Sequence, residues 1–241
     1  MKKHNSVTEM VSIPLYVYGL LRRVRYAAAL ALCLASGVST AAYVPYTDQA
    51  LFLAAAGGSA QTLDFEGLSS GTTLASGSSV GGITFSYSIG PPPLSMMVAS
   101  DFLTTSGSNY LGLDDPGNYN QFIAGDGFTL SFANPVTALG MYFVSGDPLY
   151  AGDIHLVTSA GTALNASTVN ITLGDGGLAY YLGLVSTNSF TSASIQFDPG
   201  AVGTFLYNVD DITMAAVPLP GTAWLLLSGL GMGLAALRKR R

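Results

Sequence analysis

The sequence predicts an all-β protein: a single antiparallel β-sandwich, jelly-roll-like, flanked by an N-terminal signal peptide and a C-terminal transmembrane sorting helix. Apolar and polar residues alternate along several short stretches, which is the pattern of strands with one buried face. Clusters of Gly and Pro, such as residues 90–93 and 174–177, separate these stretches and are typical of turns. Both ends of the chain combine an apolar run with Arg and Lys, which is typical of targeting segments.

The body between the two ends, residues 43–216, has the length of one domain with a single core. One helix is expected at residues 47–56, with Asp48 near its first turn. The predicted strands have apolar residues at every second position, and they lie at Leu63–Glu66, Ile83–Ile89, Phe128–Phe132, Leu139–Phe143, Val169–Leu173 and Ala193–Phe197.

Residues 1–42 have the layout of a secretory signal peptide. A cationic region ends at Arg25, an apolar core follows at residues 26–34, and small residues come next. These are the three parts of a signal that signal peptidase removes, and we expect cleavage after Ala41 or Ala42. The apolar core is too short for a membrane anchor. Arg22 and Arg23 would also fit a twin-arginine export signal, but the residues that follow them, Val-Arg-Tyr, fit that signal poorly.

The charges of the body are of one sign. All nine Lys and Arg lie at or before Arg25 or at or after Arg238, whereas thirteen of the fourteen acidic residues lie in the body. Nucleic-acid binding by phosphate neutralisation is therefore excluded, because it needs Lys or Arg. The carboxylates must lie apart, be solvated, or coordinate a divalent cation such as Ca²⁺. The one cysteine, Cys33, precedes the body, so the body has no disulfide.

Residues 217–241 show three features in a fixed order. Pro218 and Pro220 hold the backbone extended. Residues 222–237 carry no charge, and as a transmembrane helix they would rise about 24 Å, slightly less than a hydrocarbon core of about 30 Å. A basic tail ends the chain and would stay on the cytoplasmic side: Arg238, Lys239, Arg240 and Arg241. A permanent membrane anchor is the simpler alternative to a sorting signal.

This tripartite layout resembles the PEP-CTERM signal of Gram-negative surface proteins, which exosortases recognise. The family motif reads Val-Pro-Glu-Pro, and here Leu219 stands where Glu is usual, in the run Val217, Pro218, Leu219, Pro220. The resemblance implies export, a temporary membrane anchor, and processing by an exosortase. Residues 219–223 also resemble the Gram-positive sortase motif Leu-Pro-x-Thr-Gly, with Ala in the last position, so a sortase substrate is an alternative.

The body resembles the ectodomains that PEP-CTERM proteins carry. Three patches support this resemblance: residues 63–68 (Leu-Asp-Phe-Glu-Gly-Leu), residues 106–112 (Ser-Gly-Ser-Asn-Tyr-Leu-Gly) and residues 207–212 (Tyr-Asn-Val-Asp-Asp-Ile). The resemblance implies a β-sandwich of no settled activity. It therefore adds fold and location and says little about chemistry.

Catalytic candidates are few. Residues 67–71 match Gly-x-Ser-x-Gly, but a nucleophile elbow needs a helix after the Ser, and a Ser/Gly-rich loop is expected there. His155 would be the one base available, and its alternation with apolar neighbours places it on the outer face of a strand. No pair of carboxylates stands out as the acid and nucleophile of a glycosidase. We expect no catalytic residues and no enzyme activity.

Two acidic pairs suggest a structural calcium ion. Asp210 and Asp211 interrupt an alternating strand, which predicts a β-bulge, and Asp64 or Glu66 would join them if the first and last strands pair. The competing interpretation is that these acids only keep an exported protein soluble. Tyr110, Tyr180 and Tyr181 could form an aromatic platform or pack inside the sandwich.

Two classes of function fit these observations. The first is an exported bacterial surface or extracellular-matrix protein that is not an enzyme, is processed by an exosortase and associates with exopolysaccharide. The second is a secreted carbohydrate-active enzyme or a carbohydrate-binding module. The absence of a convincing acid–base constellation favours the first.

Overall fold

The computed structural model describes residues 43–216 and confirms an all-β chain of antiparallel strands. The predicted cleavage site at Ala41 and Ala42, the sorting motif 217–220, the helix 222–237 and the basic tail 238–241 lie outside the described residues. Within residues 43–216, no helix is long and apolar enough to cross a membrane.

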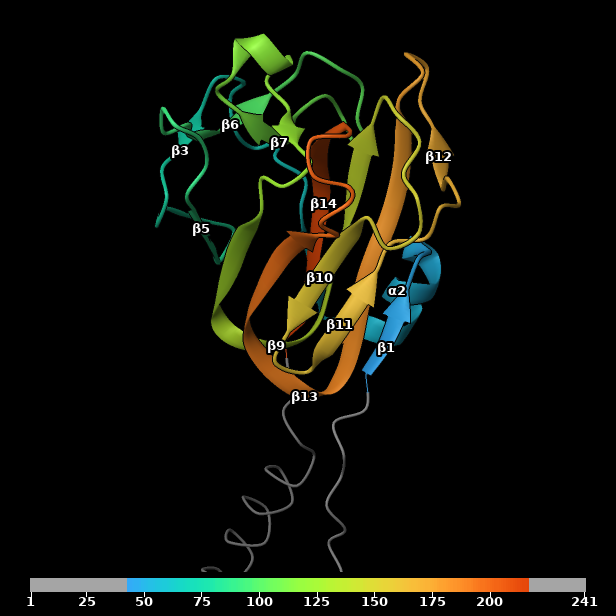
Figure 1. Ribbon diagram of the computed structural model, residues 1–241. Helices are drawn as coiled ribbons and strands as arrows, with labels where there is room; N and C mark the ends of the chain where they lie inside the picture. Colours follow the sequence, from blue (N-terminus) through green and yellow to red (C-terminus); the bar gives the residue numbers. More distant parts are fainter. Residues whose placement is uncertain (1–42, 217–241) are drawn as a thin grey trace, which may run out of the picture. The chain divides into compact units, whose positions relative to one another are not determined.

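Two long bent strands organise the sheet, β9 (Phe128–Ser145) and β13 (Leu178–Phe197). They pair with each other along both halves, and the register shifts between Val185 and Ser192, where both strands bend (Figure 1). Because each half has different neighbours, the sheet folds over into two layers around one core.

The first layer joins the start of β9 and the end of β13 to four shorter strands. These are β4 (Ser79–Val80), β5 (Ile83–Tyr87), β10 (Ile154–Thr158) and β11 (Gly161–Leu164). The second layer joins the end of β9 and the start of β13 to β14 (Leu206–Ala216), with further strands β1 (Tyr43–Tyr46), β2 (Ala60–Leu63), β3 (Thr73–Leu74), β6 (Met96–Ala99), β7 (Tyr110–Leu113) and β12 (Ile171–Thr172). A short strand β8 (Phe122–Ile123) pairs with the start of β14, after a 3₁₀ turn at Pro116–Asn118.

The core lies between the layers and follows the alternation of the sequence. Phe128, Leu130 and Phe132 of β9 point inward, and the ring of Phe143 packs at a tilt against Tyr207 of β14, with centroids 5.9 Å apart. Burial of these apolar side chains, together with the rest of the core, favours folding.

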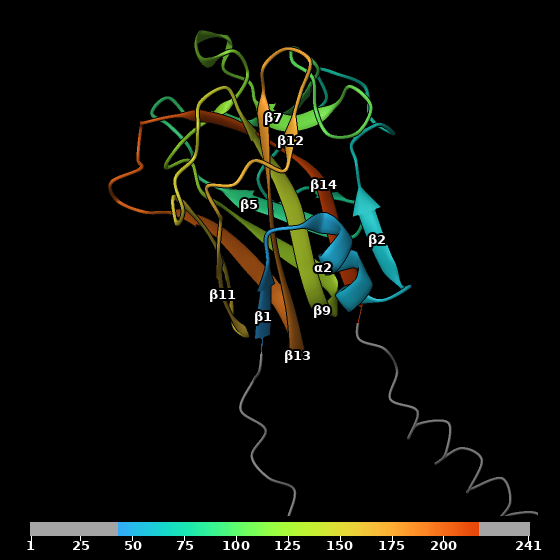
Figure 2. The same cartoon turned by 90° about the vertical axis from the view of Figure 1, so that its right-hand side faces the viewer.

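Helix α2 (Gln49–Ala56) covers part of the outer face of the second layer (Figure 2). Its Phe52 is fully buried against Tyr181, and Gly140 and Gly183 leave room for the ring. The helix starts two residues later than predicted because Asp48 is its N-cap, with Oδ1 accepting a hydrogen bond from Leu51 N at 2.9 Å.

Two strands differ from their predicted bounds: β2 lies earlier in the chain than Leu63–Glu66, and β12 is shorter than Val169–Leu173. β2 ends at Leu63 because Phe65 has a φ of 61° and turns the chain, although its ring is fully buried. β12 spans only two residues because the side chain of Asn170 takes over the pairing: it donates to Thr47 O at 2.8 Å and accepts from Tyr181 N at 2.7 Å.

Candidate functional site

The three sequence patches meet at one loop, residues 104–109. The Oε1 atom of Glu66 accepts hydrogen bonds from the backbone N–H groups of Ser108 at 2.8 Å and Asn109 at 2.6 Å. The Asn109 side chain donates in turn to Leu68 O at 2.8 Å. Glu66 thus fixes one end of the 104–109 loop, immediately before the chain enters β7.

Asp210 fixes the other end of the loop. Its Oδ2 atom accepts hydrogen bonds from the hydroxyls of Thr104 at 2.7 Å, Thr105 at 2.8 Å and Ser106 at 3.2 Å, and from the N–H groups of Thr105 at 3.1 Å and Ser106 at 2.9 Å. The side chain is fully buried. Burial raises the pKa of Asp210 to about 6, and the charge of Asp211 adds to the rise, whereas the loop hydrogen bonds oppose it.

The predicted β-bulge at Asp210 and Asp211 is confirmed. The register of β14 against β9 shifts between Asp210 and Thr213, and Asp211 has a φ of 53°. The bulge leaves both acids facing the loop, where Asp211 Oδ2 accepts from the Thr105 hydroxyl at 3.0 Å.

The four predicted calcium ligands do not form one cluster. No three acidic, His or Cys side chains within residues 43–216 lie together in a way that could hold a metal ion. Asp64 and Glu66 do follow the strand that pairs with β14, as expected. However, Asp64 Oδ1 accepts from Glu66 N at 3.1 Å, and Glu66 and Asp210 each bind a different end of the 104–109 loop.

Several carboxylates of the body accept hydrogen bonds from backbone N–H groups, in a body that has no Lys or Arg to pair with them. Asp153 accepts from Tyr150 N at 2.6 Å, Asp198 from Gly200 N at 2.8 Å, and Asp175 from Leu103 N at 2.8 Å. Hydrogen bonds from neutral donors therefore provide a way to hold carboxylates that the sequence argument had not considered.

The catalytic candidates do not form a constellation. The Gly-x-Ser-x-Gly run, residues 67–71, lies in a turn followed by strand β3 rather than by a helix. His155 lies in β10 between two fully buried neighbours, as predicted, and its Nε2 atom is 2.9 Å from Gly152 O.

The three tyrosines pack inside the protein, which was the favoured of the two interpretations, and they do not form an aromatic platform. Tyr110, Tyr180 and Tyr181 are at most 1 % exposed, so none can stack on a ligand from solvent. Burial raises the pKa of the Tyr110 and Tyr181 hydroxyls above the usual value.

A cleft of about 190 Å³ lies where loop 102–103, the end of β9 and the turn at residues 175–177 meet. Because Asn208 of β14 pairs directly with Val144 of β9, both side chains lie on the same, outer face of the second layer. The lining includes Phe102, Leu103, Gln121, Val144, Asp175 and Asn208. We call this the Asn208 cleft.

The amide of Asn208 is the distinctive group of this cleft. The residue has no exposed surface, and among the described residues neither its Nδ2 nor its Oδ1 atom has a hydrogen-bond partner. A buried amide without partners costs free energy. The sequence reasoning missed Asn208, because a polar residue between Tyr207 and Val209 looks like an ordinary exposed position on a strand.

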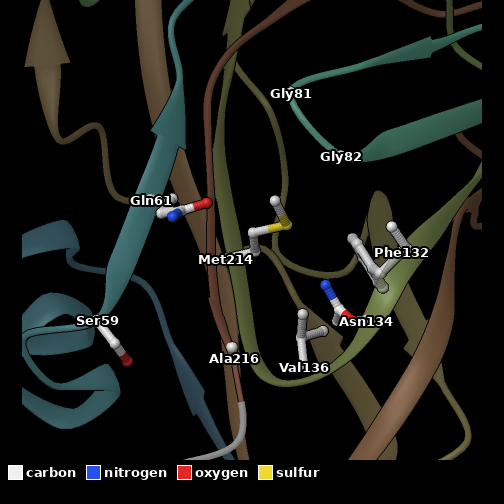
Figure 3. A pocket seen from close by; sticks show the side chains of 10 residues that line it. Ser59, Gln61, Gly81, Gly82, Phe132, Asn134, Val136, Met214 and Ala216 are labelled. Carbon is white, nitrogen blue, oxygen red and sulfur yellow. The ribbon is translucent and has the colours of Figure 1, made fainter.

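A second cleft, of about 200 Å³, lies beside the end of β14 (Figure 3). Gln61 of β2 and Met214 of β14 line one side, and the bend of β9 at Asn134 lines the other. Its lining contains no titratable side chain and offers the hydroxyl of Ser59, the amides of Gln61 and Asn134, and apolar surface.

No family model matches the chain, and no curated protein matches it significantly.

Proposed function

We propose that the chain is an exported bacterial surface or extracellular-matrix protein, which is not an enzyme and is sorted by an exosortase through residues 217–241. The observation that carries this proposal is the order of segments: a cationic, apolar address at each end of a body that has thirteen acids and no Lys or Arg. Signal peptidase and the exosortase would act in turn, with a temporary membrane anchor between the two steps.

The described body supports a role outside the cell that needs no catalysis. Several of its carboxylates, such as Asp210, accept hydrogen bonds from backbone and hydroxyl donors, and its one imidazole lies beside a carbonyl oxygen. The finer description of the fold as a jelly-roll-like sandwich and the association with exopolysaccharide belong to this proposal.

Cell fractionation with an antibody against the body tests the sorting step. The variant Pro218→Ala/Pro220→Ala should stay in the membrane fraction at its larger, unprocessed size, because an Ala pair lets the apolar helix extend into the motif. The matched control, Leu219→Glu, restores the usual family motif and should be processed like the natural chain. Release of the double Ala variant at normal size would refute an exosortase signal. Retention of the natural chain would support a permanent anchor, and anchoring to peptidoglycan would support a sortase.

A further inference from the structure

We propose that one end of the body, which carries no charged side chain, lies against the surface of an anionic lipid bilayer while the tail anchors the chain. The inference rests on the temporary membrane anchor of the proposed function and adds the surface through which the body meets the membrane. It does not depend on which enzyme later cuts the tail.

The two long strands bend at one end of the body, and both start and finish at the opposite end (Figure 1). β9 runs from Phe128 to its bend and back to Ser145, which pairs with Leu178 at the start of β13. Short turns and strand ends lie beside the bends. Together they form what we call the uncharged end, residues 56–60, 81–82, 133–137, 158–161, 186–192 and 215–216.

Both limits of the body lie at the uncharged end. Tyr43, the first described residue, pairs with β13 at its bend, and Ala216, the last, pairs with β9 at its bend (Figure 2). Residues 217–221 separate Ala216 from the apolar segment 222–237, and five residues span at most about 18 Å. A helix anchored in the membrane would therefore keep the uncharged end close to the bilayer.

The charges of the body are distributed unevenly. The uncharged end contains no Asp, Glu, Lys, Arg or His, although the body has thirteen acids. Asp147 and Asp153 lie in the loop after β9, at the opposite end and about 30 Å away along the strand. Along α2, β2 and β14, the acids that come first are Asp48, Asp64 and Asp211, each about 12–13 Å from the uncharged end.

This distribution suits an anionic membrane surface. A bilayer with anionic lipids has a negative surface potential that falls off within a Debye length, about 8–10 Å at moderate ionic strength. Carboxylates at the uncharged end would be repelled by that potential, whereas the acids of the body begin beyond its range. The body can therefore touch the membrane without losing the charge that keeps it soluble.

Apolar side chains are exposed beside the uncharged end. Helix α2 contains no charged residue. Leu51 and Leu53 of α2 and Tyr43 and Val44 of β1 are between 39 % and 63 % exposed. A surface helix usually presents charged or polar side chains to water, whereas tyrosine and aliphatic side chains are favoured at lipid headgroups. A bilayer matches both the missing charge and the exposed apolar groups.

The test measures how close each end of the body lies to lipid headgroups. The full chain carries Cys33→Ala, so that an introduced cysteine is its one thiol, and is reconstituted in vesicles of phosphatidylcholine and phosphatidylglycerol with a nitroxide on the lipid headgroups. A fluorophore on Ser189→Cys, at an exposed position in the bend of β13, should be strongly quenched. The same fluorophore on Ala151→Cys, exposed in the loop after β9, should be quenched weakly or not at all.

An added charge separates contact from the length of the tether. Asn134→Asp, at an exposed position in the bend of β9, should lower the ratio of docked to undocked chains by about fivefold (Figure 3). Gln196→Glu, exposed near the opposite end of β13, adds the same charge and is the matched control, which should leave the quenching unchanged. In vesicles of phosphatidylcholine alone, Asn134→Asp should lose most of its effect.

Three results would overturn the inference. They are equal quenching at positions 151 and 189, equal effects of Asn134→Asp and Gln196→Glu, and quenching between labelled chains without quenching by lipid, which would assign the uncharged end to a second copy. If the chain does not float with the vesicles, the anchor of the proposed function fails as well. A chain that floats and gives any of the three results overturns this inference alone, and processing of the tail is decided by the fractionation experiment.

Discussion

Asp210 allows the sharpest test of how this cation-free body holds its acids. The group is fully buried, and its pKa rises from 3.8 to about 6. Between pH 3.8 and about pH 6, Asp210 of the native protein keeps a proton that it has lost in the unfolded chain. Stability is therefore highest below about pH 4 and falls as the pH rises through 6, by about 3 kcal/mol for this group at 1.36 kcal/mol per pH unit.

The perturbation is Asp210→Asn, which is always uncharged. At pH 7 it removes a buried charge worth about 3 kcal/mol, but its NH₂ group replaces an acceptor and leaves unpaired either Asp211 N or the N–H groups of Thr105 and Ser106, at a cost of about 1–3 kcal/mol. The variant should therefore be between equally stable and modestly more stable at pH 7. At pH 4 it should be the less stable protein, because the natural side chain is then neutral and keeps its donor and acceptors.

Urea unfolding followed by far-UV circular dichroism at pH 4, 5, 6 and 7 measures this difference. The stability of the natural chain relative to the variant should fall by about 3 kcal/mol across the series, or roughly 6–12 °C in melting temperature for a body of this size. Asp114→Asn, which removes an exposed carboxylate, is the charge-matched control. If the natural chain instead gains on Asp210→Asn as the pH rises, the loop hydrogen bonds outweigh burial and the reasoning is refuted.

Three further changes test the packing around this unit. Phe52→Ala should lower the free energy of unfolding by about 3 kcal/mol, because it leaves a cavity between α2 and the sheet, whereas Leu51→Ala, at an exposed position, should change it by less than about 0.5 kcal/mol. Equal losses of stability for the two variants in chemical denaturation would contradict this packing. Gly107→Ala should destabilise the protein more than Gly71→Ala: both residues have a positive φ, but only the new methyl group at position 107 overlaps the carboxylate of Glu66. Equal melting temperatures of the two variants would contradict this contact. Burial raises the pKa of Tyr207 well above 10, so the stability that this group contributes below pH 10 should be lost above it. The absorbance at 295 nm that the natural chain shows in excess of Tyr207→Phe should therefore appear only together with unfolding; if that excess appears before unfolding, the burial is contradicted.

Local patterns predicted the strands well where burial follows alternation. Ile83–Tyr87 and Phe128–Phe132 are strands as predicted, and the structure pairs them with each other with a common core face. The bulge at Asp210 was also visible as a slip in the alternation. The prediction of a strand through Phe65 was wrong. The positive φ of Phe65 turns the chain there, and the ring is buried although the residue lies beyond the end of the strand.

The candidate site depended on contacts that the sequence does not contain locally. Glu66 was predicted as a metal ligand, and a carboxylate alone cannot indicate whether an ion or two backbone N–H groups will satisfy it. Asn208 is buried because loop 102–103 lies over a face that strand alternation leaves open to solvent. In both cases the deciding partner is far away in the sequence, on a loop with no regular pattern of its own.

The intact mass of the protein recovered from its native host tests the central claim most directly. Removal of both addresses predicts a chain that begins near Tyr43 and ends near Val217, and any mass in excess of that chain would identify what the body is attached to. A mass that still includes Arg241 would contradict the account, because the tail would then be a permanent anchor rather than a sorting signal.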